Sequence, residues 1–325
     1  MSKGRQIKGS WLKAFDEWTL PRSEAPATMI RWAGLFTLAS AVKRRIWFPR
    51  EILGSYDIFP NLYVVFVAKP GVARKSTTAG YAEELLIEAS KAMSGLNITF
   101  AGDVTSYSKL LQSLADSPDS SVVILSSEFS SLVQTTPEAM YEILTDIFDN
   151  RNKFDWSTWA HGDKQINEPV VNLLGATTPD WISAQPPQYF LGGGFASRVL
   201  FIFEREKRQH KMYYDDVDYS KVKAQKAALV NDLKIISSLK GPFSHDSKST
   251  RDYIEGWYQR HSKKEADDSR LEGYTQRKHI HAHKVAMLIS LSERNDLKIT
   301  RAHWDEAMRL LDEIEGKIPR ALSSL

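Results

Sequence analysis

The fold of this chain is decided by the stretch from Asn61 to Thr78, N-L-Y-V-V-F-V-A-K-P-G-V-A-R-K-S-T-T. Its first part, Leu62 to Val67, is an unbroken apolar run of the kind found in strands buried on both faces of a parallel sheet. A short loop with Pro70 and Gly71 follows. The residues from Ala79 to Met93 then have helical spacing, so the stretch predicts a strand, a tight loop and a helix.

This order of elements is that of a phosphate-binding loop. In such a loop the backbone amides and the positive end of the helix face the phosphates, a lysine reaches the β- and γ-phosphates, and a hydroxyl binds Mg²⁺. Lys75 and Ser76 are the residues for the last two roles, so ATP and Mg²⁺ are the expected cofactors. The predicted nucleotide-binding residues are Pro70, Gly71, Val72, Ala73, Arg74, Lys75, Ser76 and Thr77.

The loop departs from the consensus G-x-x-x-x-G-K-[ST], because Lys69 and Arg74 stand where the two glycines are expected. Aligned on its Pro-Gly pair instead, the loop has one extra residue, Arg74, ahead of Lys75. On the loop alone a second interpretation stays open, in which a basic helix N-terminus follows the strand and binds no ligand.

A second strand is predicted from Ser121 to Ser130, and it ends in an acidic residue. Glu128 is the predicted general base or water-positioning group. Ser127 stands where an aspartate usually holds the metal, so we expect Ser76 and Ser127 to be the metal-binding residues, with Ser127 the weaker of the two. A lone glutamate at a strand end is otherwise a solvated carboxylate.

Two later strands end or begin with polar residues. Val170 to Pro179 is a buried strand that ends in hydroxyl residues, and Thr178, or Thr177 beside it, fits a sensor of the γ-phosphate; the alternative is a threonine that caps the next helix. Arg198 lies near the start of the strand from Phe195 to Phe203. Its planar, permanently charged guanidinium suits an arginine finger, and an ion pair with a nearby carboxylate is the alternative.

A β-hairpin is predicted over residues 151–171, with His161-Gly-Asp-Lys164 at its tip. Lys164 is the candidate DNA-binding residue, and a solvated tip lysine is the alternative. A second, edge hairpin is predicted from Ile46 to Asp57, ahead of the phosphate-loop strand.

Composition limits the class of protein. The 325 residues carry 43 Lys and Arg against 40 Asp and Glu, and the net charge of +3 is too small to indicate a nucleic-acid binder. There is no cysteine, which excludes disulfides and cysteine-based zinc sites. No apolar stretch of about 20 residues occurs, so we expect a soluble cytoplasmic protein without a membrane partner.

A charged stretch from Glu204 to Asp218 marks the expected domain boundary. We expect a tail and short helix over residues 1–27, an α/β core with a parallel sheet flanked by helices over residues 28–208, and an α-helical lid over residues 209–325.

In this order the motifs resemble those of AAA+ P-loop ATPases close to the minichromosome-maintenance helicases, and those of helicase- or primase-associated ATPases of phages and mobile elements. The resemblance covers roughly residues 30 to 315. It implies a P-loop NTPase (AAA+/RecA-like) fold, a trans-acting finger at Ser197-Arg198, a DNA-contacting hairpin around Lys164, and a second sensor at Arg277. Arg74, Ser127 and Thr178 depart from the family pattern.

The favoured function is therefore an ATP-dependent DNA-translocating ATPase, a replicative helicase of a phage or mobile element. It would act as a hexameric ring on single-stranded DNA, together with a primase or another replication protein, in the host cytoplasm. One alternative is a nucleotide-binding helicase loader or assembly factor with little turnover, which Ser127 favours. Another is an interaction module that binds no nucleotide.

Overall fold

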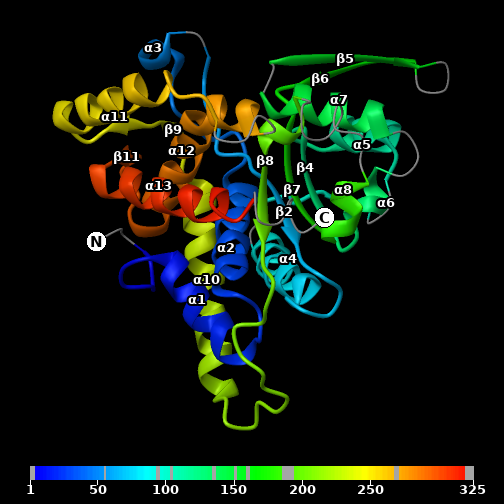
Figure 1. Ribbon diagram of the computed structural model, residues 1–325, viewed down its shortest axis with the longest axis vertical. Coiled ribbons are helices and arrows are strands. Elements are labelled where there is room, and N and C mark those ends of the chain that lie inside the picture. Colours follow the sequence, from blue (N-terminus) through cyan, green and yellow to red (C-terminus); the bar gives the residue numbers. More distant parts are fainter. Residues whose placement is uncertain are drawn as a thin grey trace.

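The computed structural model describes residues 4–54, 56–92, 96–102, 105–133, 137–149, 152–158, 162–184, 194–266 and 271–318. At its centre lies a five-stranded parallel sheet with the strand order β3-β4-β7-β2-β8 (Figure 1). The chain is thus an α/β protein, as the sequence predicts. The strands are β2 (Tyr63–Val67), β3 (Phe100–Ala101), β4 (Ser121–Ser126), β7 (Val170–Thr177) and β8 (Val199–Phe203).

Strand β2 shows why its apolar run is unbroken. Successive side chains of a strand point to opposite faces of the sheet. Val64 and Phe66 enter one hydrophobic cluster, whereas Tyr63, Val65 and Val67 enter another on the opposite face. Both faces are covered by helices, so every position of this strand is buried.

Helices cover the two faces in separate sets. On one face lie α2 (Ala27–Val42) and α4 (Lys75–Lys91), which share their cluster with Val64 and Phe66. The helices on the other face are α5 (Tyr107–Asp116), α6 (Phe129–Leu132), α7 (Pro137–Phe148) and α8 (Pro179–Ser183). The helix that leaves β2 therefore goes to one face, while the helices that follow β4 and β7 go to the other.

The C-terminal part is helical, as predicted. Its helices are α10 (Tyr219–Ser238), α11 (Lys248–His261), α12 (Glu272–Glu293) and α13 (Arg301–Glu315). Side chains of α10, α12 and α13 belong to the same hydrophobic cluster as α1 (Trp11–Thr19), α2 and α4. The C-terminal helices are thus packed against the core, and the domain boundary at residue 208 stays a prediction.

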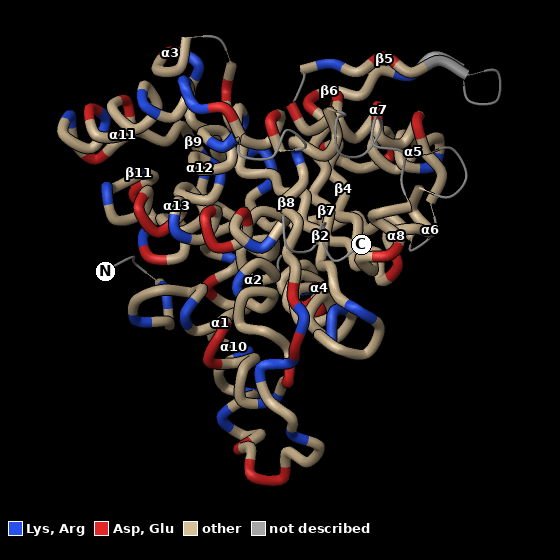
Figure 2. The backbone as a smooth tube through the Cα atoms, viewed as in Figure 1, with Lys and Arg blue, Asp and Glu red and all other residues tan. Residues whose placement is uncertain are grey.

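Between β8 and α10, residues 204–218 form no helix or strand. With the start of α10, this segment makes the projection at the lower end of the molecule in Figure 1, and acidic residues lie at its lowest turn in Figure 2. Among the described residues, no helix has both the length and the apolar character needed to cross a bilayer.

Two predicted hairpins have different outcomes. Strands β5 (Lys153–Thr158) and β6 (Gly162–Asn167) pair antiparallel, which confirms the first. The edge hairpin from Ile46 to Asp57 is present only as an isolated antiparallel bridge between Phe48 and Ile58. There, β1 (Ile46–Trp47) pairs in parallel with β9 (Gly241–Pro242), and the short helix α3 (Arg50–Leu53) follows Pro49. Proline has a fixed φ and no N–H to donate, so it favours a helix start over a ladder.

Candidate functional site

The ends of β2, β4 and β7 meet at one edge of the sheet, because the three strands are parallel and β7 lies between the other two. The connections from β2 and from its neighbour β7 leave toward opposite faces. In open α/β sheets, ligands bind in the crevice outside the carboxyl ends of the strands at such a point. This carboxyl edge holds the loop before α4, the Ser127-Glu128 pair and Thr178.

The loop begins with a tight turn that needs its Pro-Gly pair. The Val72 N–H donates a hydrogen bond to the Lys69 carbonyl at 3.3 Å, and Gly71 has a φ of +73°. Proline second and a residue of positive φ third is the pattern of a type II turn, in which glycine avoids strain. Lys69, Pro70 and Gly71 are all exposed, so the turn is open to a ligand.

Arg74 occupies the position of the second consensus glycine, and its backbone has left-handed values, φ 51° and ψ 38°. Its Nε donates to Oε2 of Glu24 at 2.8 Å, and Lys207 Nζ donates to the same oxygen at 2.9 Å. The hydrogen bonds from Lys207 and then Arg74 lower the pKa of Glu24 to about 2. The loop thus keeps the glycine-like conformation with an arginine, whose side chain ties the N-terminal segment to α4.

Lys75 is the first residue of α4, and its Nζ donates a hydrogen bond across the loop to the Ala68 carbonyl. Partial burial lowers the pKa of Lys75, and the nearby Glu128 carboxylate opposes this effect. Lys75 and Glu128 follow β2 and β4 at the same edge of the sheet, with β7 between the two strands. The N-cap of α4 makes no side-chain hydrogen bond, so its first amides are left for another acceptor.

Glu128 and Ser127 directly follow β4 and are exposed. The Glu128 carboxylate accepts a hydrogen bond from Ser130 Oγ at 3.0 Å, which orients it. Hydroxyl and carboxylate oxygens are ligands that Mg²⁺ accepts. Among the described residues, however, no three His, Cys, Asp or Glu side chains gather to hold a metal. A Mg²⁺ ion held by Ser76 and Ser127 would need phosphate oxygens and water to complete its coordination.

Thr178 caps the following helix, which is the alternative role that the sequence left open for it. Its Oγ1 accepts a hydrogen bond from the Trp181 N–H at 3.3 Å and caps α8. Thr177, one residue earlier, is buried, and its Oγ1 has no partner within the described part of the chain. Thr177 pairs with Val67, the last residue of β2. The unpaired Thr177 hydroxyl therefore belongs to the residue beside the end of β2, the strand that leads into the loop before α4.

A cavity of about 700 Å³ opens beside the start of α4. Arg74 and Thr77 supply one wall, and two distant segments supply the rest. No motif in the sequence indicates this cavity, because the charged stretch from Glu204 to Asp218 predicts only a domain boundary. The lining residues are Arg22, Ser23, Glu24, Arg74, Thr77, Lys207, His210, Lys211, Met212 and Tyr214.

Arg198 and Arg277 do not lie at this edge. Arg198 directly precedes β8, and the next residue, Val199, pairs with Tyr63 at the start of β2. Five residues of β2 separate that position from the loop, about 17 Å along the strand. The motifs predict Arg198 as a trans-acting finger and Arg277 as a second sensor, and within one chain the structure places both at the opposite, amino edge of the sheet.

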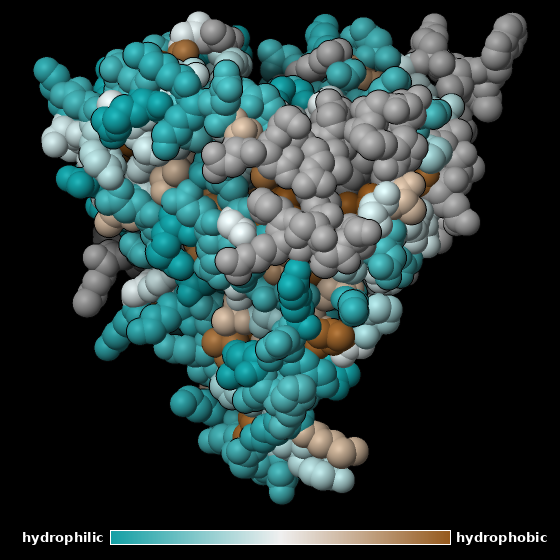
Figure 3. Space-filling model, in the orientation of Figure 1, coloured by the Kyte–Doolittle hydropathy of each residue, from teal (hydrophilic) through white to brown (hydrophobic). Residues whose placement is uncertain are grey.

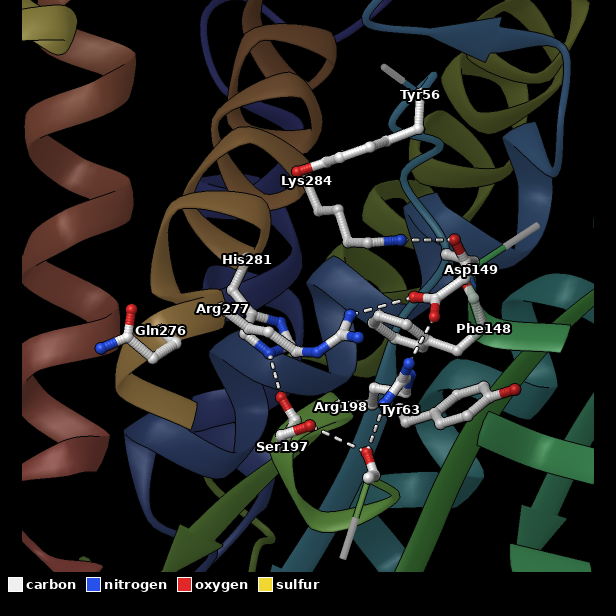
Figure 4. Close-up of polar contacts among 12 residues, drawn as sticks. Tyr56, Tyr63, Phe148, Asp149, Ser197, Arg198, Gln276, Arg277, His281 and Lys284 are labelled. Carbon is white, nitrogen blue, oxygen red and sulfur yellow. Dashed lines mark hydrogen bonds and ion pairs between the residues drawn. The ribbon is translucent and has the colours of Figure 1, made fainter. Parts of the chain in front are cut away.

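At the amino edge both arginines bind the same carboxylate, Asp149 (Figure 4). Arg198 is only 7% exposed, and its Nη2 pairs with Asp149 while its Nη1 donates to the Gly194 carbonyl at 2.6 Å. Arg277 Nη1 lies 3.0 Å from Asp149 Oδ1. The internal ion pair given as the alternative for Arg198 is therefore present, and Arg277 shares it.

A buried lysine that the sequence did not indicate completes this cluster. Lys284 Nζ donates to the Phe59 carbonyl at 2.7 Å and to Asn61 Oδ1 at 2.5 Å, and it lies 4.3 Å from the centre of the Phe148 ring. Burial lowers the pKa of Lys284 to about 7. Burial acts to raise the pKa of Asp149, but the hydrogen bond and charge of Arg198, aided by Arg277, lower it overall.

The prediction that Lys164 lies on the hairpin tip is wrong. Lys164 is the third residue of β6, opposite Trp156, and residues 159–161, which include His161, lie outside the described part. Its Nζ contacts Gln112 Oε1 at 3.1 Å and Asp116 Oδ1 at 3.7 Å, both on α5. The side chain reaches this helix because β6 packs beside α5.

Comparison with protein-family models gives no match, and comparison with curated proteins gives no significant match. The site must therefore be interpreted from its own geometry.

Proposed function

We propose that this chain is a P-loop ATPase that binds ATP with Mg²⁺ at the carboxyl edge of its sheet and hydrolyses it. The observation that carries the proposal is that Lys75, Glu128 and an uncapped helix N-terminus lie at the same edge of a parallel sheet, at its switch point. The adjoining cavity of about 700 Å³ has room for a nucleoside beside the phosphates.

Each residue of the edge has a chemical role in this proposal. Lys75 and the first amides of α4 bind the phosphates, and Ser76 supplies an oxygen to the metal. Glu128 orients the attacking water and accepts its proton. The buried Thr177 hydroxyl, which has no partner in the described structure, is the donor best placed to contact the terminal phosphate or that water. Mg²⁺ supplies charge neutralisation on the phosphates.

We further propose that hydrolysis drives movement on single-stranded DNA by an oligomer, as in the helicases that the motifs resemble. The internal arrangement supports a shared site, because the arginines lie at the edge opposite to their own Lys75. Only a neighbouring copy could present them to the nucleotide, and only after release from Asp149.

The second candidate, a loader or assembly factor with little turnover, is favoured by one observation. Both arginines are held by Asp149 of their own chain, and Arg198 is buried. An ATPase that needs a trans arginine would hydrolyse slowly while this cluster stays closed.

ATP hydrolysis measured with and without single-stranded DNA tests the proposal, with nucleotide binding followed separately by a fluorescent ATP analogue. We expect DNA to stimulate hydrolysis, and Glu128→Gln to bind ATP but lose turnover by about 100-fold or more. Tight binding with no stimulated turnover supports the loader. Absence of nucleotide binding refutes both candidates.

A further inference from the structure

The cavity beside the start of α4 has a basic lining that an uncharged nucleoside does not explain. Four cationic side chains line it, Arg22, Arg74, Lys207 and Lys211, against one carboxylate, Glu24. The segment that supplies the two lysines belongs to the projection at the lower end of the molecule, where the surface is mainly hydrophilic in Figure 3. The base and ribose of ATP carry no charge, so they would leave this lining without a counter-ion.

The carboxylate of the lining is already fully used. Glu24 Oε2 accepts hydrogen bonds from Arg74 Nε at 2.8 Å and from Lys207 Nζ at 2.9 Å, and its Oε1 accepts from the Lys211 N–H at 3.1 Å. Lys211 Nζ has a partner outside the lining, Asp216, at 2.6 Å. Even when Asp216 is counted, the four cations are balanced by two carboxylates, which leaves an excess of two positive charges.

Arg22 is the cation best prepared for a ligand. Its guanidinium carbon lies 4.1 Å from the centre of the Trp18 ring and 4.5 Å from that of Tyr81. Its Nε donates a hydrogen bond to the Trp18 carbonyl at 3.1 Å, whereas its Nη2 has no partner among the described residues. The side chain is thus held in place while part of its hydrogen-bonding capacity is unused, and a planar guanidinium in this state suits a phosphate.

We propose that this site prefers nucleotides that carry a second phosphate on the ribose, and that the basic cavity binds this phosphate. The proposal rests on the function proposed above, because the 5′ phosphates of the same nucleotide occupy the loop before α4. A phosphate monoester carries about −1.5 to −2 charge at pH 7, which matches the excess of two positive charges.

The size and the charge of the cavity both favour this class of ligand. Its volume of about 700 Å³ is within the range of about 300–1,000 Å³ for small-molecule sites, so a nucleoside and one more phosphate fit together. A phosphodiester of a nucleic-acid strand has a single negative charge and would leave one cation unbalanced. A nucleotide held at both ends would also compete with ATP and inhibit its hydrolysis.

Competition binding on the full chain tests the proposal, with the fluorescent ATP analogue as the reporter and the ionic strength held constant. The three competitors are ADP, adenosine 5′-diphosphate 2′-phosphate and adenosine 5′-diphosphate 3′-phosphate. We expect at least one of the two ribose-phosphorylated compounds to bind more tightly than ADP by about tenfold or more.

Two variants locate the second phosphate through the ratio of these affinities to that of ADP. Arg22→Gln and Lys211→Gln each remove one cation of the lining, and each should reduce the ratio by about threefold or more. Lys211→Gln keeps the test open if Arg22→Gln disturbs the packing of Trp18 and Tyr81. Lys221→Gln, an exposed lysine on α10 outside the lining, is the matched control and should keep the ratio.

Two results overturn the proposal while leaving the ATPase function in place. One is equal affinity for ADP and for both ribose-phosphorylated compounds. The other is a preference that survives in both Arg22→Gln and Lys211→Gln, which would place the second phosphate outside this cavity. If the folded chain binds none of the three competitors and no ATP analogue, the nucleotide function itself is refuted.

Discussion

At the carboxyl edge of the sheet, Ser127 and Glu128 lie on exposed loop positions, and Lys75 makes one hydrogen bond across its loop. At the amino edge, Arg198 and Lys284 are buried, and each has partners within the chain. Both edges carry the same kinds of charged groups. The difference teaches that the surroundings, rather than the residue type, decide whether a charge is available to a ligand.

The difference has an energetic basis. A buried charge is tolerated only when its hydrogen bonds and counter-ion are supplied by the fold, so removing Asp149 would leave the Arg198 charge uncompensated and lower the stability. An exposed charge at a helix start contributes little to stability but is ready to bind an anion. We therefore expect substitutions at the carboxyl edge to change activity and those at the amino edge to change stability.

The largest effect is expected for Lys75→Ala. Removing the phosphate-binding ammonium should lower the rate of ATP hydrolysis by about 100- to 1,000-fold, while the free energy of unfolding changes by less than about 1 kcal/mol. A coupled ATPase assay and urea unfolding measure the two. Lys69→Ala, in the same loop but exposed, is the control and should keep most of the activity. Equal effects of the two variants would remove Lys75 from the site.

The next effect is expected for Asp149→Ala, which leaves the buried Arg198 without its counter-ion. Breaking a fully buried pair costs about 3–5 kcal/mol, and because the Asp149 side chain is 42% exposed we expect about 2–3 kcal/mol in urea unfolding. Glu142→Ala, an exposed carboxylate on α7, the helix that ends directly before Asp149, is the control. If the two variants lose the same free energy of unfolding, the Asp149 carboxylate does not stabilise the buried Arg198, and the amino edge does not differ from the carboxyl edge in this respect.

A smaller effect should appear in the pH dependence of stability. The pKa of Lys284 is about 7 in the folded chain and about 10.4 when unfolded, so the unfolded chain binds more protons between these values. Stability should therefore rise with pH from 7 toward 10, by up to about 1.4 kcal/mol per pH unit from this residue. Lys284→Met removes this contribution. Equal slopes for the variant and the natural chain in urea unfolding would exclude a neutral, buried Lys284.

The smallest effect is expected for Arg74→Gly. Glycine adopts the left-handed backbone without the strain of about 1 kcal/mol, but the substitution also removes an ion pair to Glu24 in which the Arg74 side chain is 48% exposed. The two changes oppose each other, so stability should stay within about 1 kcal/mol. Arg74→Ala loses the pair and keeps the strain, and it should be the less stable variant by thermal unfolding. If Arg74→Ala were more stable than Arg74→Gly, the left-handed backbone at this position would not be strained.

Much of the carboxyl edge could be predicted from the sequence, because its signals are local. Apolar runs predicted β2, β4 and β7, and the residues after them were candidates because parallel strands end at one edge. The amino edge could not be predicted in the same way. The partner of Arg198 is Asp149, 49 residues away, and nothing near Lys284 in the sequence indicates that it is buried.

By itself, the sequence determined the local features of this protein: the buried apolar run of β2, the turn at Pro70-Gly71 and the presence of a helix after it. The helix was predicted from Ala79, and in the structure α4 begins four residues earlier, at Lys75. These local features follow from backbone preferences and side-chain periodicity within a few residues. Only the tertiary structure decided that β7 lies between the strands that lead to Lys75 and Glu128, that a cavity opens beside Thr77, and that Arg277 shares Asp149 with Arg198. Strand order and burial set these contacts, and both depend on packing between segments far apart in the chain.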